Sequence, residues 1–281
     1  MSISVDFADP RWSYILGLLQ TDGHHQSGGG QKGKITLELN SRDRQVLEDI
    51  SDFLPCNSSV LDRTRDTQFK VDYTSSTLAF SSLEMRKLFA EVGLLVGRKS
   101  KSIAPPSVPI STPDYVRGLL DGDGSIGFTA KRSPFIGFVT DSEPMVRFYC
   151  DVIESVTGRV RRPGRNTRDS VFNVLLKNQA AFDLARWAWY PGHELAIPRK
   201  AAAAQSIFKF DAEVGIAATY FRKTWSDEED AIVLSNPVRR AAELLERTIK
   251  SVGARRHRLI TAGRTVAYDL NYEATTNGAT E

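Results

Sequence analysis

A seven-residue string occurs twice in this chain. Residues 17–23 read GLLQTDG and residues 118–124 read GLLDGDG, so the two copies agree at five positions and are offset by 101 residues. The offset holds downstream, because the Arg-Lys pairs at 98–99 and 199–200 are separated by the same number of residues. A repeat of about 100 residues is the size of a domain and too long for a solenoid period. It predicts two similar half-domains related by a pseudo-twofold axis.

Each copy of the string ends an apolar segment with helical spacing, and a glycine lies inside that segment, at Gly17 and Gly118. Glycine in a helix interior costs about 1 kcal/mol relative to alanine. Two such glycines at matching positions therefore indicate a helix interface in which the two backbones approach closely. The glycine that follows each aspartate, Gly23 or Gly124, is typical of a left-handed helix end.

Asp22 and Asp123 end the two predicted helices, so close packing would place their carboxylates side by side. Each carboxylate would then face the other and the negative ends of two helix dipoles, an arrangement that a cation stabilises. The last carbonyls of the helices, at Thr21 and Gly122, offer further oxygen ligands. Such ligands favour Mg²⁺ or Ca²⁺ over zinc. A single copy would indicate only a helix ending in an Asp-Gly turn, but the paired copies predict a metal site.

On these residues the chain resembles the single-chain, two-repeat LAGLIDADG homing endonucleases, with LGLLQTDG and RGLLDGDG in the places of the family signature. The resemblance spans about residues 10–212. It implies an α+β fold in which two pseudo-symmetric αββαββα half-domains form a DNA-binding saddle. It also implies a metal-dependent double-strand break in a long asymmetric DNA target, with Asp22 and Asp123 as catalytic metal ligands. Gln20-Thr21 replaces the usual Asp-Ala, and we expect Asp121 to be a helix-surface residue.

The resemblance gives two lysines a catalytic role. In the family, a lysine near the place of Lys99 and Lys200 lies by the metal and the scissile phosphate, where it would stabilise developing charge and lower the pKa of the attacking water. The alternative is a basic residue that caps a helix. Asn40 and Asp141 are weaker candidates for positioning that water. Mg²⁺ is the expected cofactor, Mn²⁺ is expected to substitute for it, and Ca²⁺ is expected to bind without supporting cleavage.

Four stretches are predicted to form β-hairpins, because they contain alternating or β-branched and aromatic runs: 24–39, 58–73, 125–140 and 159–176. The strand within 58–73 is expected at FKVDY (69–73). Core-covering helices are predicted at 43–54, 83–89, 145–156 and 181–190. A two-stranded ribbon fits the major groove of DNA. A lone lysine on such a ribbon is more commonly a solvated surface residue, but the cluster from Arg159 to Arg168 favours DNA contact. The expected DNA-binding residues of the hairpins are Lys32, Lys34, Arg63, Arg65, Lys70, Lys131, Arg132, Arg159, Arg161, Arg162, Arg165 and Arg168.

A third pattern begins after residue 212. Ser226 and Glu229 predict a capping box at a helix start, and further helices are expected near 240–246 and from Thr248. The segment 222–264 resembles the Myb/SANT-like helix-turn-helix family, whose signature is a tryptophan followed by an acidic string. The resemblance implies a small all-α DNA-binding module, and the alternative is a helical cap without DNA contacts. The expected DNA-binding residues of this module are Lys250, Arg255, Arg256 and Arg258.

The predicted domains are repeat 1 (1–104), repeat 2 (105–212), the helix-turn-helix module (222–264) and a polar tail (265–281). The proline-rich segment 103–113 suits an extended tether between the repeats.

Composition narrows the class of protein. Two cysteines, Cys56 and Cys150, indicate reduced thiols and not a disulfide framework. No apolar run approaches 18 residues and no signal peptide opens the chain, so we expect an intracellular protein of the cytoplasm or nucleoid. We expect a monomer with double-stranded DNA as its partner and no membrane or obligate protein partner. The alternative is a catalytically inactive LAGLIDADG DNA-binding regulator or an RNA-splicing maturase.

Overall fold

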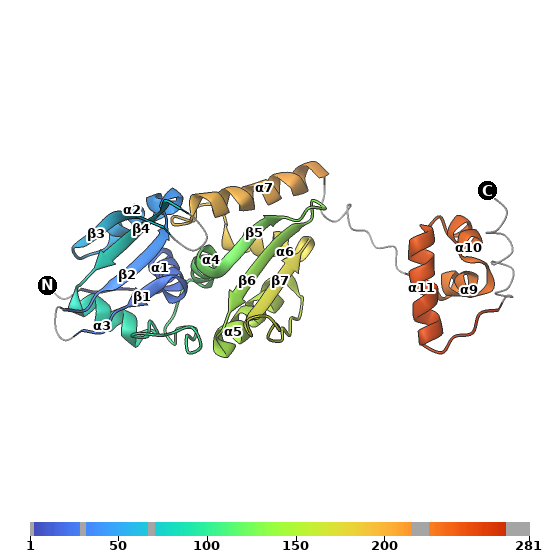
Figure 1. Cartoon of the computed structure of the whole chain (residues 1–281), viewed down its shortest axis with the longest axis horizontal. Coiled ribbons are helices and arrows are strands. Elements are labelled where there is room, and N and C mark those ends of the chain that lie inside the picture. The colour runs from blue at the N-terminus through green and yellow to red at the C-terminus, as the bar shows by residue number, and fades with distance from the viewer. Residues whose placement is uncertain (1–2, 29–31, 67–70, 215–224, 268–281) are drawn as a thin grey trace. The chain divides into compact units, whose positions relative to one another are not determined.

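The computed structural model of this protein describes residues 3–28, 32–66, 71–214 and 225–267. It separates into two compact units, unit 1 (residues 1–220) and unit 2 (residues 221–281) (Figure 1). Both copies of the repeated string lie in unit 1. A helix long and apolar enough to cross a membrane is absent from the described ranges.

The elements of unit 1 fall into two consecutive sets, each opened by a helix that carries one copy of the string. The first set is α1 (Pro10–Thr21), β1 (Gly23–His25), β2 (Ile35–Asn40), the 3-10 helix η2 (Ser41–Asp43), α2 (Arg44–Phe53), β3 (Ser58–Arg65), β4 (Tyr73–Phe80) and α3 (Leu83–Glu91). The second set is α4 (Thr112–Asp123), β5 (Gly124–Phe128), β6 (Pro134–Thr140), α5 (Glu143–Thr157), β7 (Phe172–Lys177), α6 (Gln179–Ala188) and α7 (Pro198–Val214).

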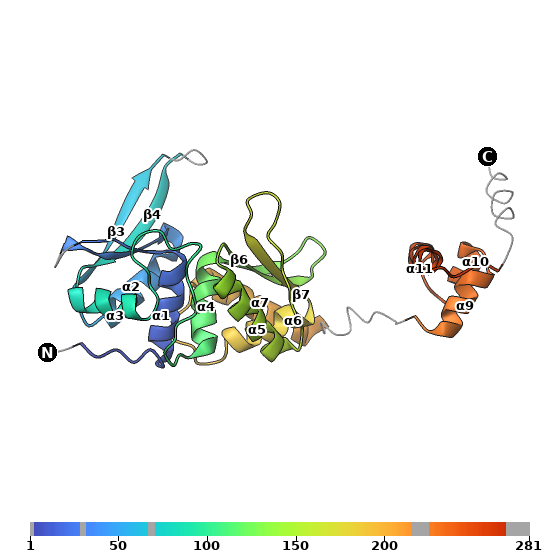
Figure 2. The same cartoon turned by 90° about the horizontal axis from the view of Figure 1, so that it is seen from below.

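Each set contains one antiparallel sheet, with strand order β1-β2-β4-β3 in the first and β5-β6-β7 in the second. Alternate residues of the strands are buried, as in β2, where Ile35, Leu37 and Leu39 face the core. Figure 2 shows the helices of unit 1 on one side of each sheet, and in the described part of this unit no helix lies on the other side. One face of each sheet is therefore left uncovered by the described elements of unit 1.

Helices α1 and α4 cross with their backbones in contact. A Cβ atom on Gly17 would lie 2.3 Å from the Tyr115 carbonyl oxygen, and one on Gly118 would lie 2.2 Å from the Tyr14 carbonyl oxygen. These contacts leave no space for a side chain on either glycine. The surrounding faces are apolar and buried, as for Ile15 and Leu119.

The glycines after the two aspartates are not left-handed helix ends. Neither Gly23 nor Gly124 has a positive φ, and each begins a strand instead. Glycine is required there for space, because a Cβ atom would lie 2.5 Å from the Leu19 carbonyl oxygen at Gly23 and 2.4 Å from the Leu120 carbonyl oxygen at Gly124.

Two strand predictions were wrong. Within 159–176 only Phe172–Lys177 forms a strand, with a single bridge from Arg165 to Phe172, so the described second set has one strand fewer than the predicted αββαββα order. Neighbouring arginines repel across a ribbon, and Pro163 lacks a backbone donor. The strand expected at 69–73 begins only at Tyr73, because Asp72 adopts a positive φ in a turn (residues 69–70 lie outside the described residues).

Unit 2 consists of α9 (Asp227–Ser235), α10 (Val238–Leu244) and α11 (Ile249–Thr261), packed around a small apolar core that includes Val233 and Leu259. The predicted capping box is confirmed, because Ser226 and Glu229 exchange both hydrogen bonds. The Ala267 amide donates to the Leu234 carbonyl oxygen at 2.9 Å, so the start of the predicted polar tail belongs to this unit. The rest of that tail, 268–281, lies outside the described residues.

We predict that Gly17→Ala destabilises unit 1 by about 2 kcal/mol, because the helices must separate to admit the methyl group and overpacking outweighs the gain in helix propensity. Gly164→Ala is the matched control, since its Cβ would meet open space. Urea unfolding followed by tryptophan fluorescence measures both changes. Equal stability of the two variants would contradict the close helix contact.

Candidate functional site

The C-terminal ends of α1 and α4 meet in unit 1. Asp22 is the C-cap of α1 and Asp123 is the last residue of α4. A Cβ atom on Gly122 would lie 1.9 Å from Thr21 Oγ1 and 3.3 Å from Asp22 Oδ2, so these helix ends are in direct contact. Both aspartates are solvent-accessible. The contact therefore presents two carboxylates from different halves of the chain on one accessible surface.

The surroundings of the two aspartates disfavour their charged forms. Loss of hydration inside the fold and the nearby charge of Asp123 raise the pKa of Asp22 to about 6. Loss of hydration also raises the pKa of Asp123, although Lys99 and Lys200 oppose this shift. A like-charged neighbour and partial desolvation both act against ionisation.

Each helix end holds a buried lysine. Lys99 Nζ donates to the carbonyl oxygens of Leu19, Gln20 and Thr21, at 2.9, 2.7 and 2.7 Å. Lys200 Nζ does the same for α4, donating to the carbonyl oxygens of Leu120, Asp121, Gly122 and Gly124 at 2.7, 2.6, 3.3 and 2.9 Å. Loss of hydration lowers the pKa of Lys99 to about 8 and lowers that of Lys200, while nearby carboxylates oppose both shifts.

These contacts bear on the roles expected for four residues. All three protons of the Lys99 ammonium group are used in its carbonyl contacts, so its Nζ caps α1. Lys200 caps α4 in the same way, and the catalytic role predicted for both lysines stays a prediction. The Thr21 and Gly122 carbonyl oxygens, predicted as metal ligands, each accept a hydrogen bond from one of these lysines and keep a second lone pair. The carboxylates of Asp22 and Asp123 are the more exposed oxygen donors for a cation.

Two tyrosines tie the helices together reciprocally. The Tyr14 hydroxyl of α1 donates to Asp121 Oδ2 of α4 at 2.8 Å, and the Tyr115 hydroxyl of α4 donates to Gln20 Oε1 of α1. The members of these pairs are offset by 101 residues, like the repeated strings. Asp121 is only 1% exposed, so its assignment to the helix surface was wrong.

Gln20 and Asp121 also hold the chain segments that carry the lysines. Gln20 Nε2 donates to the carbonyl oxygens of Gly93 and Ala104, both at 3.1 Å, on either side of Lys99. Asp121 Oδ2 accepts from the Ile197 amide at 2.6 Å, shortly before Lys200. An amide side chain can donate to carbonyls and a carboxylate can accept from an amide, so each residue matches the group that its segment presents.

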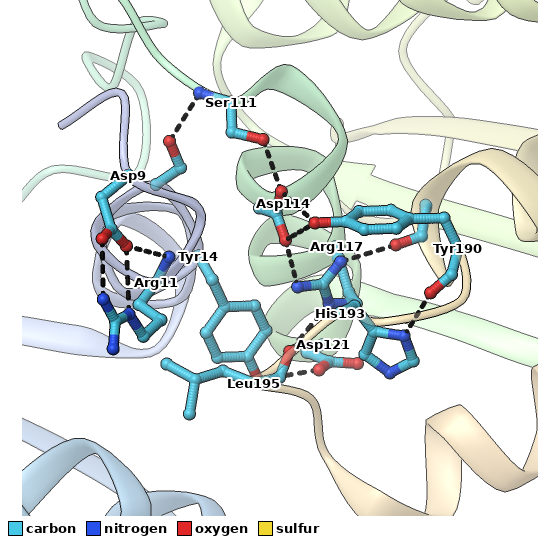
Figure 3. Close-up of polar contacts among 12 residues, drawn as sticks. Asp9, Arg11, Tyr14, Ser111, Asp114, Arg117, Asp121, Tyr190, His193 and Leu195 are labelled. Carbon is cyan, nitrogen blue, oxygen red and sulfur yellow. Dashed lines mark hydrogen bonds and ion pairs between the residues drawn. The ribbon is translucent and has the colours of Figure 1, made fainter. Parts of the chain in front are cut away.

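On the α4 side, a buried ion pair also holds a neighbouring chain segment in place (Figure 3). Arg117 pairs with Asp114, and both side chains are almost fully buried. Arg117 also donates to the carbonyl oxygens of Ala188 and Leu195, at 2.7 and 2.8 Å, and the Tyr190 hydroxyl donates to Asp114. Together these contacts fasten the segment that leads from α6 into α7.

Arg199, next to Lys200, joins the two halves at another point. Its Nε donates to both carboxylate oxygens of Asp43, at 3.1 and 3.0 Å, and Asp43 is buried between η2 and α2. The first turn of α7 is thus held by both element sets of unit 1. Asn40 caps η2 by accepting from the Arg42 amide, and Asp141 pairs with Arg165 at 2.6 Å, so both candidates for positioning a water have structural partners.

The donor set at the helix ends fits a hydrated hard cation. A cluster of three or more His, Cys, Asp or Glu side chains suited to a metal is absent from the described part of the chain. Mg²⁺ commonly uses one or two carboxylates and completes its shell with water and substrate phosphates. The pair Asp22 and Asp123 is consistent with that mode and not with a closed all-protein cage.

The predicted DNA-binding cations of unit 1 divide into two groups. Arg65, Arg165 and Arg168 form ion pairs with Glu38, Asp141 and Asp169, at 2.7, 2.6 and 2.7 Å. Lys70 lies outside the described residues. Among the described residues, no ion pair involves the remaining members: Lys32, Lys34, Arg63, Lys131, Arg132, Arg159, Arg161 and Arg162.

In unit 2, two of the four predicted DNA-binding residues have internal roles. Arg256 is 6% exposed and donates to the Val233 and Asn236 carbonyl oxygens, which caps the end of α9. Arg255 pairs with the buried Asp230 at 2.6 Å. These side chains hold α11 against α9, and the DNA contacts predicted for them stay a prediction. Lys250 and Arg258 are exposed on α11.

The hydrogen bonds between the tyrosines of one helix and the polar residues of the other could have been predicted from the repeat. Tyr14 and Tyr115, like Gln20 and Asp121, occupy matching positions of the repeat, and an offset comparison of all polar residues would have found both pairs. The Asp114–Arg117 pair had no such signal, because Ser13 and Leu16 stand at the corresponding positions.

No family model matches this chain, and no curated protein matches it. Among solved structures, the chain is similar to the LAGLIDADG homing endonuclease I-GzeII in complex with its DNA target, at 12% identity over 76% of this chain and 94% of that chain, with a TM-score of 0.48. It is also similar to the LAGLIDADG meganuclease I-AabMI bound to uncleaved DNA, at 13% identity over 75% of this chain and 96% of that chain, with a TM-score of 0.47. A third likeness is to full-length DUF199/WhiA from Thermatoga maritima, at 12% identity over 92% of this chain and 93% of that chain, with a TM-score of 0.45. All three scores lie below 0.5, so the function of the chain has to follow from its own residues.

The raised pKa of Asp22 predicts a pH-dependent effect of Asp22→Asn. Ionisation of this group opposes folding, so its destabilisation is absent below pH 3.8 and is complete above about pH 6. We expect Asp22→Asn to stabilise unit 1 by on the order of 1 kcal/mol at pH 7.5, a value reduced for solvent screening at this accessible position, and by almost nothing at pH 4. Urea unfolding at both pH values measures this. Asp52→Asn, at an exposed site on α2, is the control, and an equal gain from Asp22→Asn at pH 4 and pH 7.5 would contradict the assignment.

Proposed function

We propose that this chain is a metal-dependent, site-specific endonuclease that makes a double-strand break in a long asymmetric DNA target, in the manner of LAGLIDADG homing endonucleases. The observation that carries the proposal is the meeting of Asp22 and Asp123 at the touching ends of α1 and α4. Two accessible carboxylates from two halves of the chain suit a reaction that acts on two DNA strands. The paired sequence motifs support the same function.

Divalent cations bound at this site would activate water and stabilise the charge on the phosphate and on the leaving 3′ oxygen. The residues of the chain supply the rest. Asp22 and Asp123 would hold the cation, with waters and DNA phosphates as its other ligands. Lys99 and Lys200 would act as positioning residues, because they bind the last carbonyls of both helices and so fix the places of the two carboxylates.

The proposal includes two pseudo-symmetric half-domains that form a saddle over DNA. In support, each half opens with a motif helix, covers one face of its sheet with helices and leaves the other face open (Figure 2). Cations that form no ion pair within the described ranges, such as Lys34, Arg63, Lys131 and Arg132, belong to the strands and turns of these sheets. Each phosphate neutralised by such a residue would make binding more dependent on salt. An intracellular monomer that meets duplex DNA directly fits this function.

Unit 2 is proposed to be a helix-turn-helix module that reads DNA with α11. The exposed residues of α11 include Lys250, Ala254, His257 and Arg258, whose spacing places them along one side of the helix. Arg255 and Arg256 bind within the unit, so their side chains do not cover this side of α11. A three-helix unit that inserts one helix into the major groove exposes its contacts in this way.

We predict that Asp22→Asn and Asp123→Asn each abolish double-strand cleavage while DNA affinity stays within about tenfold, because the substitutions remove metal ligands and not DNA contacts. The target is first selected from a randomised duplex library in Ca²⁺ and then assayed for cleavage in Mg²⁺ and Mn²⁺. Asp52→Asn is expected to cut like the unchanged protein. A double Asp22→Asn, Asp123→Asn variant that still linearises the target would refute the active-site assignment.

A second candidate function is a DNA-binding regulator that keeps the fold without cleaving. The observation in its favour is that Lys99 and Lys200 place two positive charges beside Asp22 and Asp123, which offset the negative charge of the carboxylates without a metal. The cleavage assay separates the two functions. Tight, specific binding without any nicking in Mg²⁺ or Mn²⁺ would favour the regulator.

For unit 2, we predict that the double substitution Lys250→Ala, Arg258→Ala lowers the slope of log affinity against log salt by about 2, with unchanged helix content, because about two phosphate contacts are lost. Arg256→Ala is expected to unfold the unit, since it removes the cap of α9 and empties a buried site. Binding titrations at several salt concentrations and circular dichroism measure these effects. A double variant with unchanged affinity at every salt concentration would show that this side of α11 does not contact DNA.

A further inference from the structure

The open face of the second sheet in unit 1 carries an apolar strip. Strand register places Leu175 of β7 opposite Gly137 of β6, and Gly137 opposite Ser125 of β5. A Cβ atom on Gly137 would lie 2.8 Å from Ser125 Oγ and 3.6 Å from Leu175 Cδ1, so these side chains share one face. Phe135 and Val139 lie on the same face, two residues to either side of Gly137 along β6.

The strip is exposed and nearly free of charge. Leu175 is 45% exposed and Val139 is 37% exposed, and the helices of this half cover the opposite face of the sheet (Figure 2). The corresponding open face of the first sheet presents Thr36, Glu38, Asn40, Arg63 and Thr77 together with one exposed apolar residue, Leu61, which is 68% exposed. Charged side chains therefore lie among the strand residues of the first face, whereas the cations of the second face lie at the rim of its strip.

The rim of the strip is positively charged. Lys131 and Arg132 stand in the turn between β5 and β6, and Lys177 ends β7. No ion pair within the described ranges involves these three residues, whereas the nearby acids Asp141 and Asp169 are each paired with an arginine. A second copy of this face would bring like charges together. A polyanion that presents apolar groups between its charged groups would match both the apolar strip and its positively charged rim.

We propose that this strip, formed by Phe135, Val139 and Leu175, reads thymines through their 5-methyl groups in the major groove. The inference rests on the proposed DNA binding and specifies what the second half recognises. Thymine is the base that presents a methyl group in the major groove, and apolar side chains are its usual partners there. The rim cations hold the adjacent phosphates.

Deoxyuridine tests the strip directly, because it differs from thymidine only by the missing methyl group. Each replacement at a thymine that the strip contacts is expected to weaken binding about three- to fourfold, the value for burial of one methyl-sized group. The loss that depends on the strip is expected in the half-site that the second half of unit 1 contacts.

The test uses the full chain and a duplex selected from a randomised library in Ca²⁺. Thymines are replaced by deoxyuridine in one half-site at a time, and binding is measured for the unchanged protein, for the double variant Val139→Thr, Leu175→Asn, and for Val160→Thr. Val160 is the matched control, because it is 53% exposed and lies outside the sheet. With thymines replaced in the half-site that the second half contacts, the double variant should bind the thymine and deoxyuridine duplexes equally, while Val160→Thr should keep the full loss.

The outcomes separate the inference from the proposed function. A deoxyuridine loss that persists unchanged in the double variant overturns the inference, as does a selected target in which deoxyuridine has no effect in either half-site. Both results leave DNA binding intact. Failure of the unchanged protein to select any duplex overturns the proposed function and the inference together.

Discussion

The contact between the backbones of α1 and α4 is the constraint on which the site depends. Gly17 lies against the Tyr115 carbonyl and Gly118 against the Tyr14 carbonyl, with no room for a Cβ atom. Backbone atoms cannot change rotamer, so this contact sets both the distance and the register of the helices. At their ends, Gly122 against Thr21 continues the same contact. The positions of the Asp22 and Asp123 carboxylates, which are far apart in the sequence, therefore depend on the close contacts of Gly17, Gly118, Gly122 and Thr21.

That geometry brings together groups that repel one another. Two carboxylates and two negative helix ends share a region with reduced hydration, and the raised pKa of Asp22, about 6, is the result. Lys99 and Lys200 stabilise the arrangement by donating to the final carbonyls of both helices. Their own burial is unfavourable, as the lowered pKa of Lys99 shows. Gln20 and Asp121 hold the segments that carry these lysines, so the charge balance depends on buried neighbours one or two residues before the helix ends.

The parts of the structure that follow from local pattern were predictable from the sequence. The predicted core helices match α2, α3, α5 and α6 to within two residues at each end, and the capping box at Ser226 was also found. The failures have tertiary causes. Asp121 looked like a surface residue because its partners, Tyr14 and Ile197, are far away in sequence. The internal contacts of Arg256 were missed because its acceptors are backbone carbonyls, whose positions cannot be read from a sequence. The strand β4 was misplaced because its polar residues hide the inward alternation of Leu78 and Phe80.

Joining the two halves on one chain allows them to diverge wherever the helix contact does not constrain them. Tyr14 and Tyr115 keep matching roles, since each bonds to the opposite helix. Away from this contact the halves differ. Asp114 and Arg117 form a buried ion pair where the first helix has Ser13 and Leu16. Leu175 and Val139 are exposed together on one open face, while the other open face presents Leu61 among charged residues such as Glu38 and Arg63. A dimer of identical chains would have to present the same face twice. A single chain with one shared site and two different faces can instead match a target whose halves differ in sequence.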